Sequence, residues 1–542
     1  MLARWIRRLW VAVMKVCTVV AGLWITVTYN PRRRLIAAMT AVVLIAGVTV
    51  GAITLANQSD ECPAGYYRGS LHECIGVTDG GYDFIPGLHD VDQAIWAQNR
   101  YAVQTAAQQN GQVVTVALLL PLTSTDPSMQ IEILHAVQGA YVAQYRENED
   151  ADGVEPYIRL VLANPGADST QFPPVVQQLQ AMTGEPDNLR VVASISVSTS
   201  TTIQEVHGLA DANIPVVGGA ITGNDIANTA KDPYLYPGLA RIEPNNEEEA
   251  SALSQYVSQS VGKVNKQQAV LVEDTREGDS PDDYISTLAA AFAGDSAYAA
   301  YQFDSPNNED LVGDTANTFD TTVQQICNIA NSRHVKWIYF AGRQVQLTVF
   351  INALASACPG TNFTILTGSA ASHLSNMTST SEESPGEPVL DTSAFSKGIA
   401  LEYAAIAAPG MSAPGYPAFS GTISAAAGTG KGKIGVVSLA DGQAIINYDA
   451  VLTAIKGIRQ QTSPKNPLPT LPEIGESWGQ LSGPYDVPGA SGLICLENDG
   501  NPYDKLVPIV KYSVNGTPVP VGPAWPTGTA LTSPCVVPRG AG

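Results

Sequence analysis

The residues best suited to bind a ligand form a run of hydroxyl side chains near the middle of the chain. Six of the seven residues from 196 to 202 are Ser or Thr, in the order SVSTSTT. Hydroxyl groups at the start of a helix, together with the free backbone N–H groups there, can hold a polar or anionic group. A helix cap needs only one such side chain. We therefore expect part of the run, Ser196, Ser198, Thr199, Ser200 and Thr201, to contact a ligand.

The segments around this run predict where it lies in a fold. It follows an apolar strand predicted at residues 191–195, and a helix separates it from a second apolar strand that begins at Ile214. Strands that are almost entirely apolar are typical of a parallel sheet with both faces covered. In open α/β sheets, ligands collect at the carboxyl ends of the strands. The hydroxyl run is expected at that edge.

The sequence offers little for metal binding or cofactor chemistry. It contains no HExxH motif and no CxxC pair, and its six His residues are scattered. Residues 428–433 are rich in Gly and Lys, but Ala425 and Gly432 stand where a phosphate-binding loop needs Gly and a Ser or Thr. We predict that the protein is not an enzyme, uses no cofactor and holds no metal.

Charge is distributed unevenly along the 542 residues. Residues 1–55 hold seven of the 29 Lys and Arg and none of the 50 Asp and Glu, so the remainder carries 22 positive against 50 negative charges. Nucleic-acid binding needs cationic side chains that neutralise phosphates. An acidic body of this kind argues against a nucleic-acid partner.

The N-terminal region is predicted to anchor the protein in a membrane. Residues 35–55 are 21 residues without a charge, long enough to cross a bilayer as a helix. Arg32, Arg33 and Arg34 precede them, and Asp60 and Glu61 follow. The cationic side should stay in the cytoplasm, which predicts a single-pass protein of the cell membrane with an extracellular body. A cleaved signal peptide is the alternative.

The cysteines fit an oxidising compartment. Apart from Cys17, all of them follow the predicted anchor, and their number is even. Fifteen connectivities are possible for six cysteines. Sequential pairing closes the shortest loops, and it predicts the disulfides Cys62–Cys74, Cys327–Cys358 and Cys495–Cys535.

From residue 112 onward, predicted strands and helices alternate, which indicates βαβ units and parallel sheets. A first series ends near residue 243 and a second of similar size follows, so two lobes are expected. Residues 369–393 are predicted to be a surface loop, and 409–433 a Gly- and Pro-rich stretch. Residues 493–496 and 506–514 are expected to pair as a hairpin through Asn498, Asp499 and Gly500.

Several motifs, in this order and spacing, resemble the type I periplasmic binding protein superfamily. They are VALLLPLT with QGAYVAQY, SVSTSTT, PVVGGAIT, RIEPNNEEEA, AVLVEDT, IYFAGR, NYDAVLTAI and GLICLENDG with VPIVKYSVNG. The closer likeness is to branched-chain-amino-acid-type substrate-binding receptors of ABC transporters, in a membrane-anchored actinobacterial version. The likeness covers about residues 112–516. It excludes the predicted anchor, the segment between the anchor and residue 112, and the residues after 516.

The resemblance implies an α/β fold of two Rossmann-like parallel-sheet lobes, joined by hinge crossings, that close on a ligand. With the predicted transmembrane helix it gives this division of the chain: a basic cytoplasmic or interfacial segment (1–34), an anchor (35–55), a disulfide-containing preface (56–111), lobe I (112–243), lobe II (244–408), a return to lobe I (409–490), a final hairpin on lobe II (491–516) and a Pro-rich tail (517–542).

The resemblance also implies ligand contacts beyond the hydroxyl run. Ala220 and Thr222 match positions that hold a ligand carboxylate, and Tyr284, Arg343 and Ser369 match second-lobe positions near the ligand's ammonium group. Ser369 stands where amino-acid-binding relatives tend to have Glu, and Arg343 lies near the place of a Tyr. These departures would suit a more anionic ligand. An ion pair between Arg343 and a nearby carboxylate, without a ligand role, is the alternative.

The sequence therefore predicts a membrane-anchored extracytoplasmic receptor. It would capture a small polar or anionic, amino-acid-like ligand between two lobes, for uptake with an ABC permease or for sensing with another membrane partner. A surface scaffold or interaction protein with a degenerate cleft is the alternative function.

Overall fold

A computed structural model describes residues 62–149, 154–195, 197–229, 231–276, 282–305, 318–377 and 388–538. The chain divides into two units, residues 1–68 and 69–542. The first contributes strand β1 (Tyr67–Arg68) to the described part. Within the described residues, no helix combines the length and apolar character that a membrane span requires. The predicted anchor, residues 35–55, lies outside the described residues.

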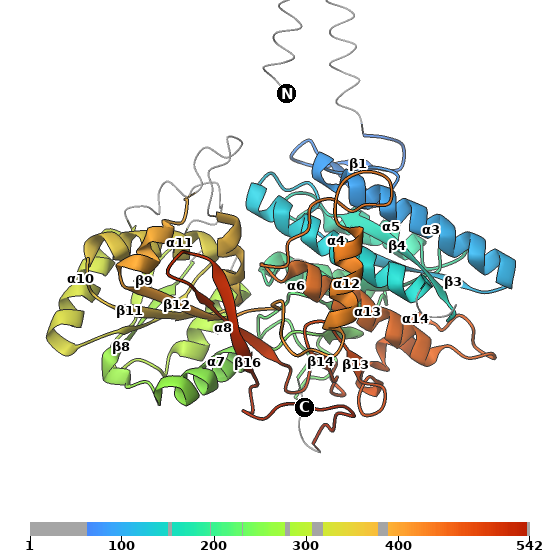
Figure 1. The fold of residues 1–542 in the computed structure, drawn as a ribbon. Helices are drawn as coiled ribbons and strands as arrows, with labels where there is room; N and C mark the ends of the chain where they lie inside the picture. Colours follow the sequence, from blue (N-terminus) through green and yellow to red (C-terminus); the bar gives the residue numbers. More distant parts are fainter. Residues whose placement is uncertain are drawn as a thin grey trace, which may run out of the picture. The chain divides into compact units, whose positions relative to one another are not determined.

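The second unit contains two large sheets, and the half built around the first sheet is called lobe I here (Figure 1). Its strands lie in the order β2 (Cys74–Thr78), β4 (Tyr157–Asn164), β3 (Val113–Leu119), β5 (Leu189–Ala193), β6 (Val216–Gly218) and β7 (Leu239–Arg241). β2 is antiparallel to β4, and the other pairs are parallel. The alternation of predicted strands and helices is confirmed for this lobe.

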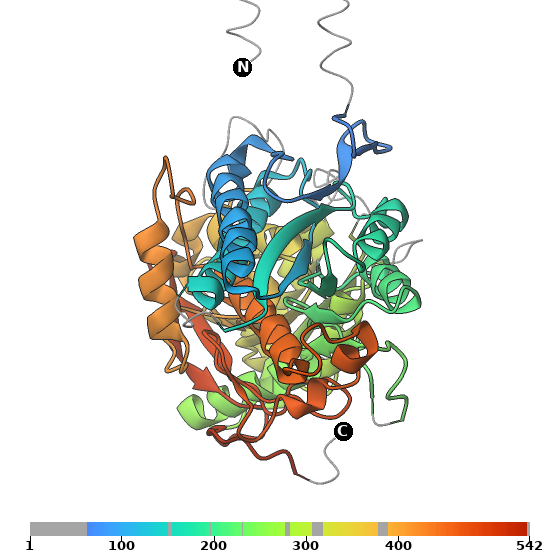
Figure 2. The same cartoon turned by 90° about the vertical axis from the view of Figure 1, so that its right-hand side faces the viewer.

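Helices cover both faces of the lobe I sheet (Figure 2). They are η1 (Pro86–Leu88), α3 (His89–Gln109), α4 (Pro127–Glu149), α5 (Phe172–Ala181), α6 (Ser200–Asp211), α12 (Tyr416–Ala426), α13 (Gln443–Gln461), α14 (Leu471–Gly475) and η6 (Trp478–Gln480). One apolar cluster joins Val175, Leu179, Val206 and Leu209 of α5 and α6 to the sheet. Strand residues alternate between faces, so each buried strand supplies apolar side chains to both helix layers.

Helices α4 and α13 approach each other at Gly139. A Cβ atom at this position would lie 2.0 Å from the backbone oxygen of Ala444, which real Cβ atoms do not tolerate. The glycine is therefore needed for close packing of two long helices that flank the predicted ligand edge.

Replacing Gly139 with Ala is expected to lower the free energy of unfolding by roughly 3 kcal/mol, because the added methyl group must push two backbones apart. Urea denaturation measures this change. Gly421→Ala is the matched control, since it lies in helix α12 with no atom within 4 Å of an added Cβ. It should leave stability unchanged or raise it by about 0.5–1 kcal/mol. Equal unfolding midpoints for the two variants would contradict the packing argument.

Lobe II is built around the second sheet. Its seven strands lie in the order β16 (Pro518–Ala524), β15 (Val507–Tyr512), β12 (Ile399–Ala404), β11 (Phe363–Thr367), β10 (Trp337–Ala341), β8 (Ala269–Asp274) and β9 (Tyr301–Phe303). The five strands from β12 to β9 are parallel, and β15 and β16 are antiparallel. The helices are α7 (Asn246–Val261), η2 (Lys266–Gln268), α8 (Asp283–Phe292), α10 (Thr318–Arg333), α11 (Gln344–Ala357), η4 (Ser369–Met377) and η5 (Thr392–Lys397).

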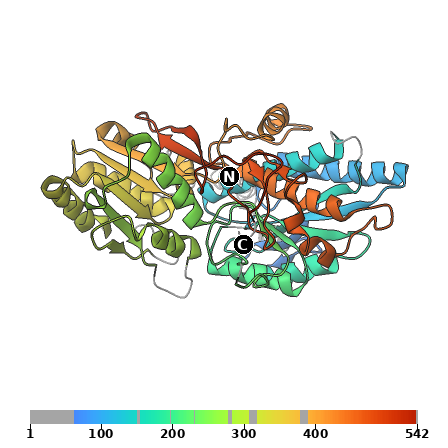
Figure 3. The same ribbon diagram turned by 90° about the horizontal axis from the view of Figure 1, so that it is seen from below.

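The two faces of the lobe II sheet have separate apolar clusters. Val270 and Phe340 face helices α10 and α11, whereas their neighbours Leu271 and Tyr339 face α7 and α8. Figure 3 shows each sheet inside its own lobe. Each lobe therefore has an apolar core of its own, as expected for two units of a hinged fold.

The chain crosses between the lobes after β7, after β12, between β14 (Leu493–Ile494) and β15, and again after β16, where the tail returns to Cys495. Buried polar groups tie the crossings together. Asp449 of α13 accepts hydrogen bonds from the backbone N–H groups of Ala490 (2.6 Å) and Ser491 (2.7 Å). Lys505 donates to the Ser491 hydroxyl at 2.8 Å. Arg241 N–H donates to the Gly500 carbonyl at 2.9 Å.

Two local predictions are wrong. Residues 369–377 form the 3-10 helix η4, most of which is buried instead of lying in a surface loop. The strands predicted at 493–496 and 506–514 do not pair with each other, because β14 pairs with β13 (Val487–Pro488) and β15 pairs with β12 and β16. The predicted turn through residues 498–500 does close a short antiparallel bridge between Leu496 and Pro502. Within the Gly- and Pro-rich stretch, residues 416–426 form helix α12. β16 is rich in proline, which lacks a backbone N–H, and the strand lies at the edge of the sheet, where the missing hydrogen bond is tolerated.

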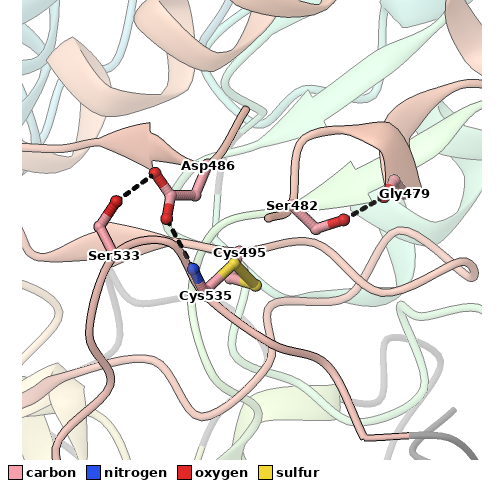
Figure 4. The surroundings of a disulfide bond; sticks show 6 residues. All are labelled: Gly479, Ser482, Asp486, Cys495, Ser533 and Cys535. Atoms are coloured by element: carbon pink, nitrogen blue, oxygen red, sulfur yellow. Dashed lines mark hydrogen bonds between the residues drawn. A yellow bond between two sulfur atoms is a disulfide. The ribbon is translucent and has the colours of Figure 1, made fainter. Parts of the chain in front are cut away.

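The disulfide prediction is confirmed. Cys327–Cys358 and Cys495–Cys535 are bonded, and Cys62 and Cys74 are disulfide-bonded as well. Near Cys535, the Asp486 carboxylate accepts from the Ser533 hydroxyl at 3.0 Å and from the Cys535 N–H at 2.9 Å (Figure 4). The Pro-rich tail is thereby held by a covalent bond and by two hydrogen bonds.

Candidate functional site

The candidate site lies at the carboxyl edge of the lobe I sheet. β3, β5 and β6 are parallel neighbours, so the segments that follow them meet there. A small cavity of about 30 Å³ occupies this edge, and its lining includes Leu120, Pro121, Ser194, Ala220, Glu132 and Asn447. The Ser194 hydroxyl donates to the Asn447 side chain of α13. A cavity of this size has room for about two waters.

The hydroxyl run has mainly structural partners in this state. Ser198 is buried, and its hydroxyl oxygen accepts hydrogen bonds from the N–H groups of Thr222 (3.1 Å) and Gly223 (2.9 Å). Thr199 is the N-cap of α6 and accepts from the Thr202 N–H at 3.3 Å. These bonds favour the cap alternative for Thr199. They also place Ser198 against the loop that carries Thr222, as the resemblance implied.

The other residues predicted to contact the ligand from lobe I differ in burial and in hydrogen-bond partners. Ser200 and Thr201 lie half-buried in the first turn of α6. Thr222 is buried, and its carbonyl accepts from the Asn246 N–H of α7 at 2.8 Å. Ser196 lies outside the described residues.

The contacts of Arg343 bear on the two alternatives that the sequence left open for it. Its guanidinium donates to both carboxylate oxygens of Asp282, at 2.9 and 2.8 Å, and lies 4.6 Å from the centre of the Tyr284 ring. It also donates to the carbonyl of Ser198 in the opposite lobe at 2.9 Å. Its charge is neutralised by Asp282, so the structure favours the ion-pair alternative over an anion-binding role.

Tyr284 and Ser369 belong to one buried cluster in lobe II. The Tyr284 hydroxyl accepts from the Ala370 N–H at 3.0 Å, and the Tyr284 N–H donates to the Ser198 carbonyl at 3.3 Å. Burial raises the pKa of Tyr284 above its usual value. Burial also raises the pKa of Glu249 to about 8, although hydrogen bonds with Ser369 lower it in part. Both side chains are therefore uncharged at neutral pH, and neither is available as an ionic ligand contact.

A second inter-lobe contact involves residues that sequence reasoning missed. His373 of η4 lies with its Nδ1 2.7 Å from Oε1 of Glu132 on α4, and both side chains are buried. His135 Nδ1 lies 2.5 Å from Oδ2 of Asp441. Burial lowers the pKa of His373, but the Glu132 and Asp441 carboxylates outweigh it, so that pKa is raised above its usual value. No sequence signal pointed to these partners, because they lie far apart along the chain.

A third inter-lobe contact involves Asp283 and the loop after β6. A Cβ atom on Gly223 would lie only 1.7 Å from a carboxylate oxygen of Asp283, so the Asp283 side chain packs against the backbone of residue 223 because that residue is glycine. Burial, followed by the charge and hydrogen bonding of Asp225, raises the pKa of Asp283 to about 7. Burial and the nearby Asp225 carboxyl therefore both favour the protonated form of Asp283.

One sequence motif could indicate a catalytic site, but its surroundings in the structure do not fit that role. Residues 475–479, GESWG, match the pattern of a nucleophile elbow, but Ser477 is buried after helix α14 and donates to the Ile474 carbonyl at 2.9 Å. A nucleophile elbow would join a strand to a helix. In the part of the chain that the structure describes, no group of three or more His, Cys, Asp or Glu side chains is placed to hold a metal ion.

Comparisons with known proteins agree with this architecture. No family model matches the chain, and no curated protein matches it either. An ABC transporter substrate-binding protein from Desulfitobacterium hafniense is 16% identical over 76% of this chain and 100% of its own, with a TM-score of 0.52. A leucine-binding protein from Thermotoga maritima is 15% identical over 76% of this chain and 98% of its own, with a TM-score of 0.52.

A third similar structure is the branched-chain amino acid transporter substrate-binding protein of Streptococcus pneumoniae in complex with isoleucine. It is 13% identical over 76% of this chain and 100% of its own, with a TM-score of 0.52. Sequence identities this low establish similarity of fold only. On that basis, this chain has the type I periplasmic-binding-protein fold of ABC transporter substrate-binding proteins.

Proposed function

We propose that this chain is a receptor that closes two lobes on a small polar solute at the carboxyl edge of the lobe I sheet. We further propose that its N-terminal segment holds it on the outer face of the cell membrane, where it serves an ABC permease or a sensing partner. The resemblance of its motifs to substrate-binding receptors supports the first part. The uncharged residues 35–55 after Arg32, Arg33 and Arg34 support the second.

The observation that carries the proposal is the chemistry of the contact between the lobes. The lobes meet through polar contacts: Arg343 with the Ser198 carbonyl, His373 with Glu132, and Asp283 beside Gly223. The apolar clusters named above belong to one lobe each. Polar contacts can be exchanged for water or for a ligand, whereas an apolar core cannot be opened without a large loss of free energy. Such lobes are suited to open and close around a solute.

The fold neighbours support a small-molecule ligand. One of the structures from D. hafniense is a complex with leucine, and the S. pneumoniae structure is a complex with isoleucine. For this chain we propose a small polar ligand without assigning it to those amino acids, because Ser369 and Arg343 depart from the pattern of the amino-acid-binding receptors that the sequence otherwise resembles.

The test combines a ligand screen with a variant that blocks closure. Full-length protein in detergent is screened by thermal shift with amino acids, small organic acids and short peptides. A solute at 100 times its Kd should add about 2.7 kcal/mol of stability. Gly223→Ala puts a methyl group against the Asp283 carboxylate, so it should weaken binding of the solute found at least tenfold while both lobes stay folded.

Gly184→Ala is the control for the closure variant. An added Cβ at Gly184 meets no atom within 4 Å, so binding should equal that of wild type. If Gly223→Ala binds the solute as tightly as Gly184→Ala does, closure of these lobes is not part of recognition. Circular dichroism of both variants separates loss of binding from loss of folding.

A specific observation favours a second function, a surface scaffold with a degenerate cleft. The site cavity is only about 30 Å³, and Ser198 and Arg343 satisfy each other and their neighbours without a ligand. If no solute in a broad panel stabilises the protein, the scaffold is the better explanation.

A further inference from the structure

The inference concerns Glu132, a buried carboxylate at the edge of the site. It lies on α4 with a side chain 4% exposed, and it lines the cavity at the carboxyl ends of β3, β5 and β6. Its Oε1 lies 2.7 Å from Nδ1 of His373 and 3.5 Å from the Ser128 hydroxyl. Ser128 belongs to the same helix, so His373 is the partner that lobe II supplies.

The charge of Glu132 needs a partner whenever the lobes are closed. Removing a carboxylate from water costs several kcal/mol unless a cation or strong hydrogen-bond donors compensate. His373 is part of η4 in lobe II, so opening of the lobes carries it away from Glu132. The open lobe I therefore presents a carboxylate in the cleft wall, and reclosure requires either His373 or a ligand group of the same charge.

The surroundings do not suit an anionic ligand. Arg343 is bound by Asp282 on both carboxylate oxygens. Within the described cavity lining, Glu132 is the ionisable side chain. A second carboxylate, that of Asp441, also acts on His373; His135 accompanies it, and the Asn376 amide approaches it at 3.4 Å. An anion at this edge would face like charges at short range, which is unfavourable in a poorly hydrated site.

We propose that the ligand of this cleft carries a cationic nitrogen, an amine or guanidine group, that pairs with the Glu132 carboxylate in the place now held by His373. This inference rests on the proposed receptor function and names the chemical class of its solute. In the state described here, the His373 imidazole substitutes for the ligand cation and fills the space beside the cavity. His373 is thus an internal competitor of the solute.

Isothermal titration of the full-length protein in detergent tests this assignment. The probes are butylammonium and 1,4-diaminobutane, with butyrate as the anion of similar length. Butylammonium should bind wild type, and Glu132→Gln should weaken that binding about 10- to 100-fold, because it removes a charge-assisted hydrogen bond with little change of shape. His373→Ala should strengthen it about tenfold, because the competitor is gone. Glu476→Gln, at an exposed position, should leave it unchanged.

The outcomes separate the ligand class from the receptor function. Tighter binding of butyrate than of butylammonium overturns the cationic ligand and leaves a receptor. Equal amine binding by Glu132→Gln and wild type overturns the role of Glu132. If Glu132→Gln does not fold, the affinity of His373→Ala for butylammonium is compared with that of wild type. An affinity no higher than that of wild type overturns the proposal. If neither these probes nor the wider solute panel bind wild type or His373→Ala, the receptor function itself is overturned.

Discussion

Replacing Glu205 with Gln is expected to raise the free energy of unfolding by about 3 kcal/mol at pH 7 and to leave it nearly unchanged at pH 4.5. Glu205 lies in α6, the helix that begins with the hydroxyl run, and its side chain is fully buried. Burial raises its pKa to about 8, and a hydrogen bond with Ser169 lowers it only in part. The folded protein therefore keeps a proton on this carboxyl that the unfolded chain releases.

The direction of the pH effect follows from proton binding. Between about pH 4.5 and pH 8, the folded state binds more protons at Glu205 than the unfolded state does, so stability falls as the pH rises. The contribution is fully present below the unfolded pKa and is lost as the pH rises through the folded pKa. Gln stays neutral at every pH, so the variant should not show this loss. Asp92 acts in the same direction, because burial and Asp83 raise its pKa to about 9.

Chemical denaturation at pH 4.5, 6, 7 and 8 measures the difference between Glu205→Gln and wild type. Glu476→Gln provides the matched control, since it makes the same chemical change at an exposed position. A constant difference across the series, or a variant less stable than wild type at pH 8, would show that Glu205 is ionised in the folded protein.

Replacing Arg241 with Met is expected to lower the free energy of unfolding by about 3–5 kcal/mol and to weaken solute binding. Arg241 ends β7, just before the first crossing, and its side chain is almost fully buried. Its guanidinium donates to the carbonyls of Gly223 (2.9 Å), Ile226 (3.2 Å) and Glu243 (3.4 Å). Met would fill similar space but leave these carbonyls without their donor.

Electrostatics adds to this cost. Burial lowers the pKa of Arg241, but Glu248, Asp283 and Glu243 oppose that shift, so the guanidinium offsets several nearby carboxyls. Without it, these groups must stay protonated or repel one another. The loop from Gly223 to Ile226 lies against lobe II at Asp283, so its displacement should also impair closure.

Urea denaturation and titration with the cognate solute measure both effects of Arg241→Met. Arg100→Met is the matched control, because Arg100 is exposed and its guanidinium lies 4.6 Å from the centre of the Trp96 ring. Its loss should cost less than about 1 kcal/mol. Similar stability of the two variants would mean that Arg241 does not hold the loop or balance the buried charges.

The polar contacts between the lobes connect these predictions with function. Ser198, Thr222 and Tyr284 gather where the two lobes meet, and in this state Ser198 is hydrogen-bonded to the backbone N–H groups of Thr222 and Tyr284. When the polar groups of a receptor are already hydrogen-bonded to one another in the closed form, closing without a ligand costs little free energy. A solute must then compete with internal contacts, and His373 on Glu132 is the contact with the clearest chemical identity.

The sequence by itself determined the local elements and their order. Apolar runs of strand length alternating with amphipathic helices are short-range signals, and they predicted the parallel cores of both sheets and the meeting of the segments after β5 and β6. The even number of cysteines after the predicted anchor, paired sequentially to close the shortest loops, was enough to propose the pairs Cys327–Cys358 and Cys495–Cys535.

Only the tertiary structure decided which partner each polar side chain has. The Ser198 hydroxyl could have faced a ligand, but in the structure it accepts hydrogen bonds from N–H groups of the loop that carries Thr222. The Arg343 guanidinium could have bound an anionic ligand, but it is paired with the Asp282 carboxylate. Glu132 and His373 come from different lobes, and η4 is buried although its composition resembles a loop. The physical reason is range: apolar periodicity and capping act within a few residues, whereas ion pairs and hydrogen bonds depend on distances that exist only after both sheets have formed.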